Sequence, residues 1–120
     1  WAAMEEQIDA FLERIRAGRS TAPTAVFAAN DIAAVRVLHR AADLGVAVPE
    51  RLSVVGYDSS AVALTVRPHL TSVNQPRQEM GRIAARMLQE RREGRRTDSR
   101  SIAEPVLRIR DSTGPGPASP

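Results

Sequence analysis

The seven residues 52–58 (LSVVGYD) constrain the fold of this chain more than any other stretch. A short, nearly continuous apolar run that stops at an aromatic residue and a carboxylate is typical of a β-strand buried on both faces. Strands of this kind form parallel sheets covered by helices, and such sheets bind ligands outside the carboxyl ends of their strands. Asp58, which ends the run, therefore stands where a ligand would be held.

Two further apolar segments end in a side chain that can bind a ligand. Residues 24–29 (TAVFAA) run into Asn30, and residues 70–73 (LTSV) lead to Gln75. Amides both donate and accept hydrogen bonds, and a carboxylate accepts them from two neighbouring hydroxyl groups. We therefore predict that Asn30, Asp58 and Gln75 bind a neutral, polyhydroxylated ligand such as a sugar or a nucleoside.

Each of these three residues also has a structural interpretation. Asn30 can cap the helix that follows it, Asp58 can form a loop turn, and Gln75 can cap a helix that begins at Pro76. Spacing alone favours neither role, so both stay open for all three. We predict that Asp31, next to the cap, also serves in capping.

Helical periodicity places one helix around residues 4–15, a second over about 31–44 and a third from Pro76 to a stop at Gly94. The second is apolar nearly all round, so we expect the sheet to cover one side and a partner chain another. Residues 59–66 are predicted to form only a short helical turn.

The remaining segment, residues 106–110 (VLRIR), alternates apolar and charged residues and therefore predicts an edge strand with one wet face. The order of elements is that of an α/β protein, with a parallel sheet and right-handed crossovers. Because fewer than six strands are predicted and no strand precedes the first helix, we expect this chain to be an incomplete fragment of a longer protein.

Composition excludes several classes of site. The chain has no cysteine, so it can form neither a disulfide nor a thiolate metal site. No apolar run approaches the roughly 20 residues that a membrane helix needs. Gly45 and Gly56 are isolated, so neither a phosphate loop nor a dinucleotide fingerprint is present. We expect a protein without cofactors, located in the cytoplasm and away from the membrane.

The sequence offers no arrangement of catalytic residues. His39 and His69 lack metal-ligand spacing with acidic residues, and no histidine is placed to activate Ser59 or Ser60. We therefore predict that the chain is not an enzyme and holds no metal.

All 17 basic residues are arginine, and ten of them lie between Arg77 and Arg110. The densest run, residues 91–96 (RREGRR), has two interpretations. It can bind nucleic acid, or it can be a solvated helix end at which cations complement the helix dipole. No aromatic residues interleave the arginines to stack on bases, which favours the helix end.

Several motifs, taken in order, resemble the C-terminal part of the lactose/galactose-repressor (LacI/GalR) transcription regulators. The resemblance spans about residues 4–113 and rests on segments 23–31 (PTAVFAAND), 44–50 (LGVAVPE), 52–58 (LSVVGYD), 68–76 (PHLTSVNQP) and 110–113 (RDST). It implies a periplasmic-binding-protein-like fold, in which two α/β subdomains are joined by three crossover strands and close on an effector.

The resemblance also implies a division of the chain. Residues 1–76 would belong to the C-terminal subdomain and residues 77–105 to the other subdomain. Residues 106–112 would form a crossover strand. Residues 113–120, rich in glycine and proline, are expected to be a disordered tail.

In this family the effector contacts correspond to Asn30, Asp58 and Gln75, and contacts between the two subunits of the dimer correspond to Val35 and Val66. The implied partners are a small-molecule effector, in most members a sugar, a second copy of the chain, and DNA. DNA would be reached only through an N-terminal domain that this sequence does not contain.

Two functions are compatible with these expectations. The first is the effector-binding and dimerisation portion of a bacterial LacI-type transcription regulator. The alternative is a solute-binding receptor of the same fold that serves a transporter or a sensor. Arg77 stands where some regulators place an aromatic residue against the ligand, so the identity of the effector stays open.

Overall fold

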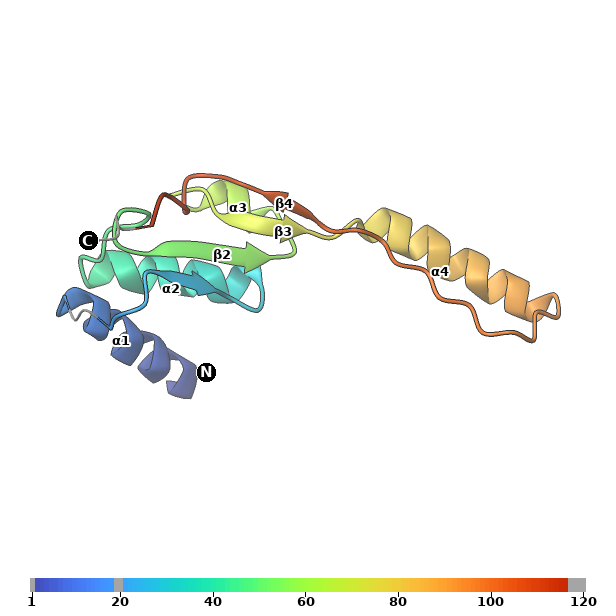
Figure 1. The fold of residues 1–120 in the computed structure, drawn as a ribbon, viewed down its shortest axis with the longest axis horizontal. Coiled ribbons are helices and arrows are strands. Elements are labelled where there is room, and N and C mark those ends of the chain that lie inside the picture. The colour runs from blue at the N-terminus through green and yellow to red at the C-terminus, as the bar shows by residue number, and fades with distance from the viewer. Residues whose placement is uncertain (1, 19–20, 117–120) are drawn as a thin grey trace.

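The structure, a computed structural model, describes residues 2–18 and 21–116. Four strands form one sheet in the order β1-β2-β3-β4 (Figure 1). The bounds are β1 Ala25–Phe27, β2 Ser53–Tyr57, β3 Thr71–Asn74 and β4 Val106–Arg108. The first three strands are parallel, and β4 runs antiparallel to β3. The predicted α/β class is confirmed. The sheet was predicted to be parallel, which holds for β1, β2 and β3 but not for β4.

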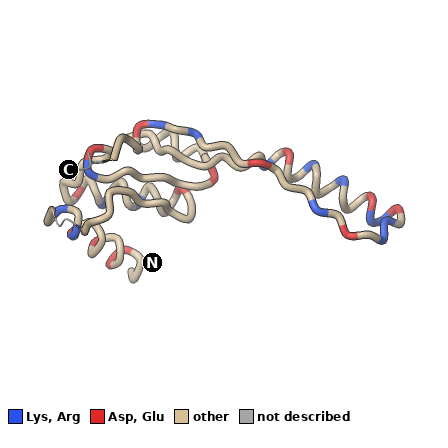
Figure 2. The backbone as a smooth tube through the Cα atoms, in the orientation of Figure 1, with Lys and Arg blue, Asp and Glu red and all other residues tan. Residues whose placement is uncertain are grey.

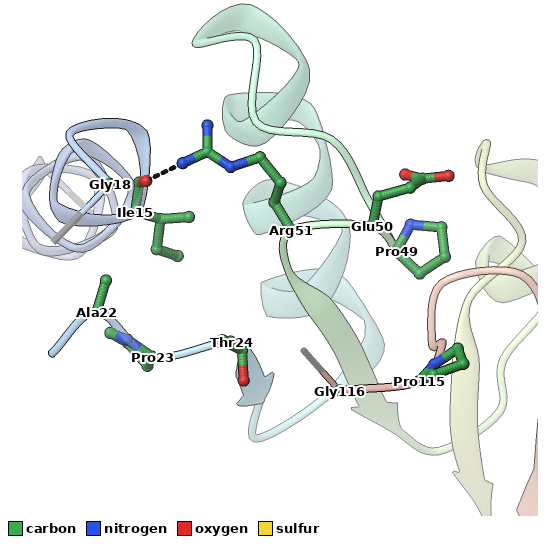
Figure 3. A pocket seen from close by; sticks show the side chains of 10 residues that line it. All are labelled: Ile15, Gly18, Ala22, Pro23, Thr24, Pro49, Glu50, Arg51, Pro115 and Gly116. Atoms are coloured by element: carbon green, nitrogen blue, oxygen red, sulfur yellow. Dashed lines mark hydrogen bonds between the residues drawn. The ribbon is translucent and has the colours of Figure 1, made fainter. Parts of the chain in front are cut away.

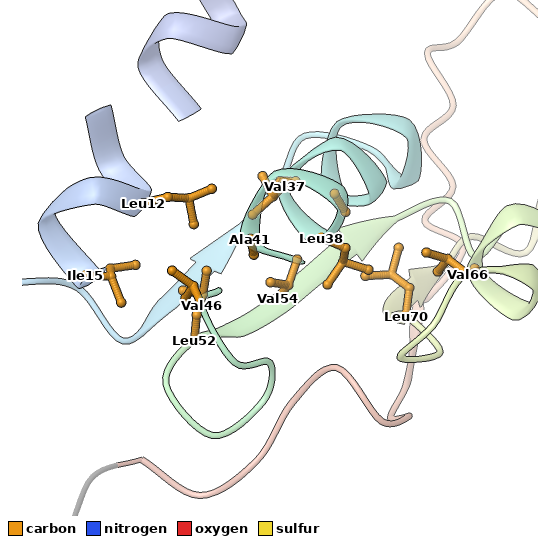
Figure 4. Packing of buried hydrophobic residues seen from close by; sticks show 13 residues of the cluster. Leu12, Ile15, Val37, Leu38, Ala41, Val46, Leu52, Val54, Val66 and Leu70 are labelled. Atoms are coloured by element: carbon orange, nitrogen blue, oxygen red, sulfur yellow. The ribbon is translucent and has the colours of Figure 1, made fainter. Parts of the chain in front are cut away.

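The four helices are α1 Ala2–Arg16, α2 Asp31–Asp43, α3 Val62–Thr65 and α4 Arg77–Arg92. Helices α1, α2 and α4 correspond to the three predicted helical segments, and α3 is the short helical turn predicted within residues 59–66. Helices α1, α2 and α3 contribute to one hydrophobic core together with the sheet (Figure 4). Its most deeply buried large side chains are Leu12 of α1, Leu52, Val54 of β2 and Leu70.

Only one face of β2 is covered, so the prediction of a strand buried on both faces is wrong for this chain. Val54 and Gly56 point into the core and are buried, whereas Val55 and Tyr57 on the other face are half-buried. Phe27, which lies opposite Val55 in β1, is 65% exposed. The physical reason is that α1, α2 and α3 share a single core on one side of the sheet.

Strand β4 lies at the edge of the sheet, as predicted, but the prediction of a single wet face is wrong. Val106, Leu107 and Arg108 are all exposed. Among the described strands it pairs only with β3, at the end of the sheet order. Its apolar side chains are therefore left on the surface.

Helix α4 projects away from the sheet, and the chain returns beside it to reach β4 (Figure 1). No residue of α4 is buried. The radius of gyration over the Cα atoms is 18.9 Å, whereas a compact chain of this length would have about 14 Å. This projecting hairpin, residues 77–105, therefore packs on nothing but itself within the described chain.

The arginine run at residues 91–96 closes α4 at the far tip of the hairpin (Figure 2). Arg95 Nε lies 3.2 Å from a carboxylate oxygen of Glu90, and Arg91 Nη1 donates to the Arg95 carbonyl oxygen at 3.1 Å. These contacts are those of a helix end stabilised by cations, which supports that interpretation of the run.

Candidate functional site

Asp58 and Gln75 meet at the carboxyl ends of β2 and β3. Tyr57 pairs with Val73 in the sheet, so the residues that follow each strand emerge side by side. Gln75 Nε2 donates a hydrogen bond of 2.6 Å to Asp58 Oδ1. This bond fixes the carboxylate, and among the described residues no group donates to its second oxygen, Oδ2. The side-chain amide oxygen of Gln75 (Oε1) and the Oδ2 atom of Asp58 are thus the acceptors that this pair can offer to a ligand.

The chain leaves β2 through a turn with an uncommon backbone. Asp58 has φ 107° and Ser59 has φ 47°, both in the left-handed region that non-glycine residues seldom adopt. Such conformations persist only where neighbouring groups hold them, and they cluster at functional sites. The turn at residues 58–60 is therefore the part of the candidate site that requires the most support from its surroundings.

Asn30 serves as the helix cap that the sequence allowed. Its Oδ1 accepts a hydrogen bond of 2.9 Å from the Ala33 backbone N–H, and its own backbone is extended, as a cap requires. The cap uses only the carbonyl oxygen of the side chain, so the two N–H donors of the amide are left for another partner. Capping and ligand binding are therefore compatible at this residue.

Asp31 does not cap, so that prediction is wrong. Its side chain is 1% exposed and accepts three hydrogen bonds from beyond the helix. Oδ2 accepts from Ser60 N at 2.6 Å and from Ser60 Oγ at 2.8 Å, and Oδ1 accepts from Ser72 Oγ at 2.5 Å. Asp31 thus joins the start of α2 to the turn after β2 and to β3.

The structure brings Asp58 and Gln75 into contact, whereas Asn30 joins them only indirectly. Asn30 precedes Asp31, which bonds to Ser60, two residues after Asp58. Gln75 lies at the position before the Pro76 cap of α4 and does not cap that helix. The roles of Ser60 and Ser72 were missed by the sequence analysis. Gly56 offered one signal of this network, since a glycine inside a strand marks a close approach of another group.

Gln75 also lines an open hollow of about 450 Å³ where the chain enters α4. The hollow is bounded by Asn74, Gln75, Pro76, Arg77, Gln78, Glu79 and Arg82. Its lining is mostly polar or charged, in keeping with a hydroxyl-rich ligand. Asp58 does not line this hollow and is linked to it only through its hydrogen bond to Gln75.

A second hollow, of about 280 Å³, lies at the opposite end of the strands (Figure 3). Pro23 and Thr24 before β1, Pro49 before β2, and Pro115 line it, and Arg51 donates to the Ile15 carbonyl oxygen beside it. It contains none of the three candidate ligand residues. Because parallel sheets bind ligands at the carboxyl ends of their strands, we assign the candidate site to the Asp58 end.

The segment 110–113 stabilises the amino-terminal ends of β2 and β3. The side chain of Ser112 is fully buried, its Oγ donates to the Val54 carbonyl oxygen at 2.6 Å, and it accepts from Thr71 N at 2.8 Å. Thr113 Oγ1 lies 2.8 Å from Thr71 Oγ1, and Gly114 N donates to Ser53 Oγ at 3.2 Å. Thr113 and Gly114 are thus tied to the sheet, contrary to the expectation of a tail that is disordered from residue 113. Residues 117–120 of that predicted tail lie outside the described residues.

The two residues predicted at a dimer interface differ in environment. Val66 is 8% exposed and packs in the core of its own chain. Val35 is half-buried on α2, while Ile32 on the same helix is 54% exposed and Leu64 on α3 is 57% exposed. Exposed apolar side chains are thus present on both α2 and α3, two helices that contact each other.

On its other side, α2 is covered by α1. Arg40 forms a two-pronged ion pair with Asp9, at 2.8 and 2.9 Å, and this pair lowers the pKa of the Asp9 carboxyl. Arg36 donates to Glu5 at 2.9 Å. A neighbouring helix of the same chain, rather than a partner, thus occupies part of the surface for which the sequence predicted a second cover.

Within residues 2–18 and 21–116, histidines and acidic residues never gather in groups of three or more suited to a metal ion. In the same described ranges, every helix is too short or too polar to cross a membrane.

Comparison with known proteins places these observations in a family. The model of the periplasmic binding protein-like domain matches residues 1–113. The chain is 44% identical over 115 residues to the HTH-type transcriptional regulator CelR of Thermobifida fusca. The aligned region covers 92% of this chain and 30% of CelR. It is 40% identical over 100 residues to the HTH-type transcriptional repressor PurR of Salmonella arizonae. This aligned region covers 82% of this chain and 29% of PurR.

Solved structures of regulators of this kind also superpose on this chain. The CelR–cellobiose complex superposes with a TM-score of 0.72 at 40% identity, covering 88% of this chain and 33% of CelR. A LacI family regulator from Lactobacillus casei with bound sucrose gives a TM-score of 0.69 at 28% identity, covering 91% of this chain and 40% of that one. The chain thus spans about a third of the regulators it matches. It belongs to the periplasmic binding protein-like domain family and corresponds to a part of this domain in LacI-family regulators.

Proposed function

We propose that this chain is the effector-binding and dimerisation portion of a bacterial LacI-type transcription regulator, and that its effector is a sugar. The observation that carries the proposal is the Asp58–Gln75 pair, which offers two oriented acceptors at the carboxyl ends of adjacent parallel strands. The open Asp58 oxygen and the Gln75 side-chain oxygen can together accept hydrogen bonds from a pair of neighbouring sugar hydroxyls. Losing one such hydroxyl would leave a protein group unpaired, so recognition would be selective.

The relatives support the same ligand class. The structures of CelR and of the Lactobacillus casei regulator contain cellobiose and sucrose. Both curated relatives are named as HTH-type transcriptional regulators, which favours the regulator over the solute-binding receptor. Regulation, rather than catalysis, is accordingly the proposed activity, with DNA binding supplied by residues of the full protein other than these.

The shape of the chain supports a division into two subdomains. In this proposal residues 1–76 belong to one subdomain, residues 77–105 contribute to the other, and residues 106–112 cross back between them. The lack of buried residues in α4 fits a helix that packs on protein outside this chain. Effector bound between the subdomains would favour one of their arrangements and so shift the population that binds DNA.

Dimerisation is proposed through the apolar surface of α2 and α3, with a second copy of the chain as the occupant. Ile32 and Leu64 are more than half exposed, and Val35 lies between the core and this surface. Val35→Asp in the full protein should lower the mass measured in solution from dimer towards monomer. An unchanged mass would count against this interface.

The sugar proposal is tested on the full-length protein by calorimetric titration with cellobiose, sucrose and glucose. We expect at least one sugar to bind, and Asp58→Ala to abolish that binding. If none of the three sugars binds, the proposed effector class is wrong.

Asn30 allows its two roles to be separated. Asn30→Asp keeps a good cap but removes both amide donors, so we expect weaker sugar binding with unchanged thermal stability. Asn30→Ala should in addition lower the free energy of unfolding by about 1 kcal/mol. Equal sugar affinity in Asn30→Asp and the parent would show that Asn30 only caps.

A further inference from the structure

We propose that Asp31 is a positioning residue for ligand recognition: from the start of α2, its carboxylate holds the turn at residues 58–60 in the conformation that presents Asp58. This inference rests on the proposed function, since it assigns the residue that orders its site. Asp31 itself is 1% exposed, so it would act on a ligand only through the turn.

The contacts of Asp31 are directed at the end of that turn. Both the backbone N–H and the hydroxyl of Ser60 donate to Oδ2, at 2.6 and 2.8 Å. The other oxygen accepts from Ser72 Oγ, and that same Ser72 Oγ accepts from Ser59 N at 3.0 Å. One buried carboxylate therefore fixes Ser60 directly and Ser59 through a single intermediate hydroxyl.

The turn needs this support because of its backbone. Asp58 and Ser59 both have φ in the left-handed region. Each such conformation is disfavoured by about one to two orders of magnitude in population for a residue with a side chain. Without an anchor at Ser60 the turn would relax, and the Asp58 carboxylate would lose its orientation towards Gln75.

Gly56 of strand β2 leaves room for the Asp31 carboxylate, because a glycine has no Cβ atom. A Cβ atom built on Gly56 would collide with Asp31 Oδ1 and would lie 2.9 Å from Leu70 Cδ2. Gly56 is therefore the position at which the start of α2 can approach β2 closely enough for Asp31 to reach Ser60.

A third element helps to hold the turn. Arg110, which follows β4, donates through Nη2 to Ser59 Oγ at 3.0 Å and through Nη1 to the Leu70 carbonyl oxygen at 2.5 Å. Arg110 holds the middle of the turn, whereas Asp31 is the group that holds the Ser60 amide.

The test compares Asp31→Asn with Ser112→Ala in the full-length protein. Both changes remove hydrogen bonds of buried side chains, but Ser112 lies at the opposite end of β2 and β3, away from the candidate site. Titration with cellobiose should show affinity reduced by about tenfold or more in Asp31→Asn, and within about twofold of the parent in Ser112→Ala. Equal affinities in the two variants would overturn the proposal, because loss of stability alone would then explain Asp31.

A second readout requires no sugar. Amide hydrogen exchange of Ser59 and Ser60 should quicken by about tenfold in Asp31→Asn relative to Ser112→Ala. Unchanged protection of these amides would overturn the proposal even if cellobiose binding fell. If the parent binds no sugar, the proposed effector fails, while the exchange result still decides whether Asp31 holds the turn.

A milder variant covers the case in which Asp31→Asn does not fold. Ser60→Ala removes only the hydroxyl bond to Oδ2 and leaves the backbone bond. It should quicken exchange of the Ser60 amide in the same direction by a smaller factor. No change in exchange would contradict the role assigned to Asp31.

Discussion

Adding one methyl group at Gly56 should strongly destabilise this fold. In Gly56→Ala the new carbon would overlap Asp31 Oδ1 and lie 2.9 Å from Leu70 Cδ2 and 3.3 Å from Ala34 Cβ. All three neighbours are buried, so none can swing into solvent. Either Asp31 moves and loses buried hydrogen bonds, at about 1–3 kcal/mol, or α2 lifts from the sheet, at about 1–3 kcal/mol for overpacking. Either outcome gives an expected loss of about 1–3 kcal/mol in the free energy of unfolding.

Gly81→Ala is the matched control for this change. Gly81 lies inside α4, and a Cβ added there meets nothing within 4 Å. The same chemical substitution should therefore stabilise the helix by about 0.5–1 kcal/mol. Urea unfolding followed by circular dichroism measures both variants. A midpoint for Gly56→Ala equal to that of the parent would refute the close approach of α2 and β2 at this glycine.

Three further predictions concern stability. Arg40 lowers the pKa of the Asp9 carboxyl in the folded protein. The stabilisation from this ion pair is therefore present above about pH 3.9, the pKa of an unfolded aspartate, and is lost as the pH falls through the lower folded pKa. Asp9→Asn should remove this part of the pH dependence of the urea midpoint. Ser112→Ala leaves the Thr71 N–H and the Val54 carbonyl oxygen without their buried partner and should cost about 1–3 kcal/mol in urea unfolding. Leu12→Ala, in the core where α1 packs against α2, should cost about 2–5 kcal/mol, whereas Leu64→Ala at an exposed position should cost far less; equal losses would contradict the packing in Figure 4.

The candidate site could be located from the sequence but not assembled from it. Strand endings identified Asp58 and Gln75, because polar residues that close apolar runs emerge at one edge of a parallel sheet. Their direct hydrogen bond and the left-handed backbone of Asp58 depend on the register of β2 against β3, which no local pattern encodes. Asp31 was misjudged for the same reason: its position beside a helix start predicts a cap, whereas its partners are 29 and 41 residues away.

The RDST segment, residues 110–113, shows a similar limit. The sequence marked it only through a resemblance, and nothing in its composition indicates burial of a serine. In the structure the Ser112 hydroxyl bonds to Val54 of β2 and Thr71 of β3, and its backbone bonds to Val54 and to His69. Such a residue is recognised only when the groups that surround it are known.

The sequence by itself determined the α/β class and the order of helices and strands, and it predicted the end of the sheet at which a ligand would be held. These follow from periodicity and from residues that begin or end elements, and both are properties of neighbours along the chain. Only the tertiary structure decided that one face of β2 stays open, that β4 runs antiparallel, and that Asp31 supports the turn at residues 58–60. Those features depend on contacts between residues far apart in the sequence, whose free energies are set by burial and geometry after the chain has folded.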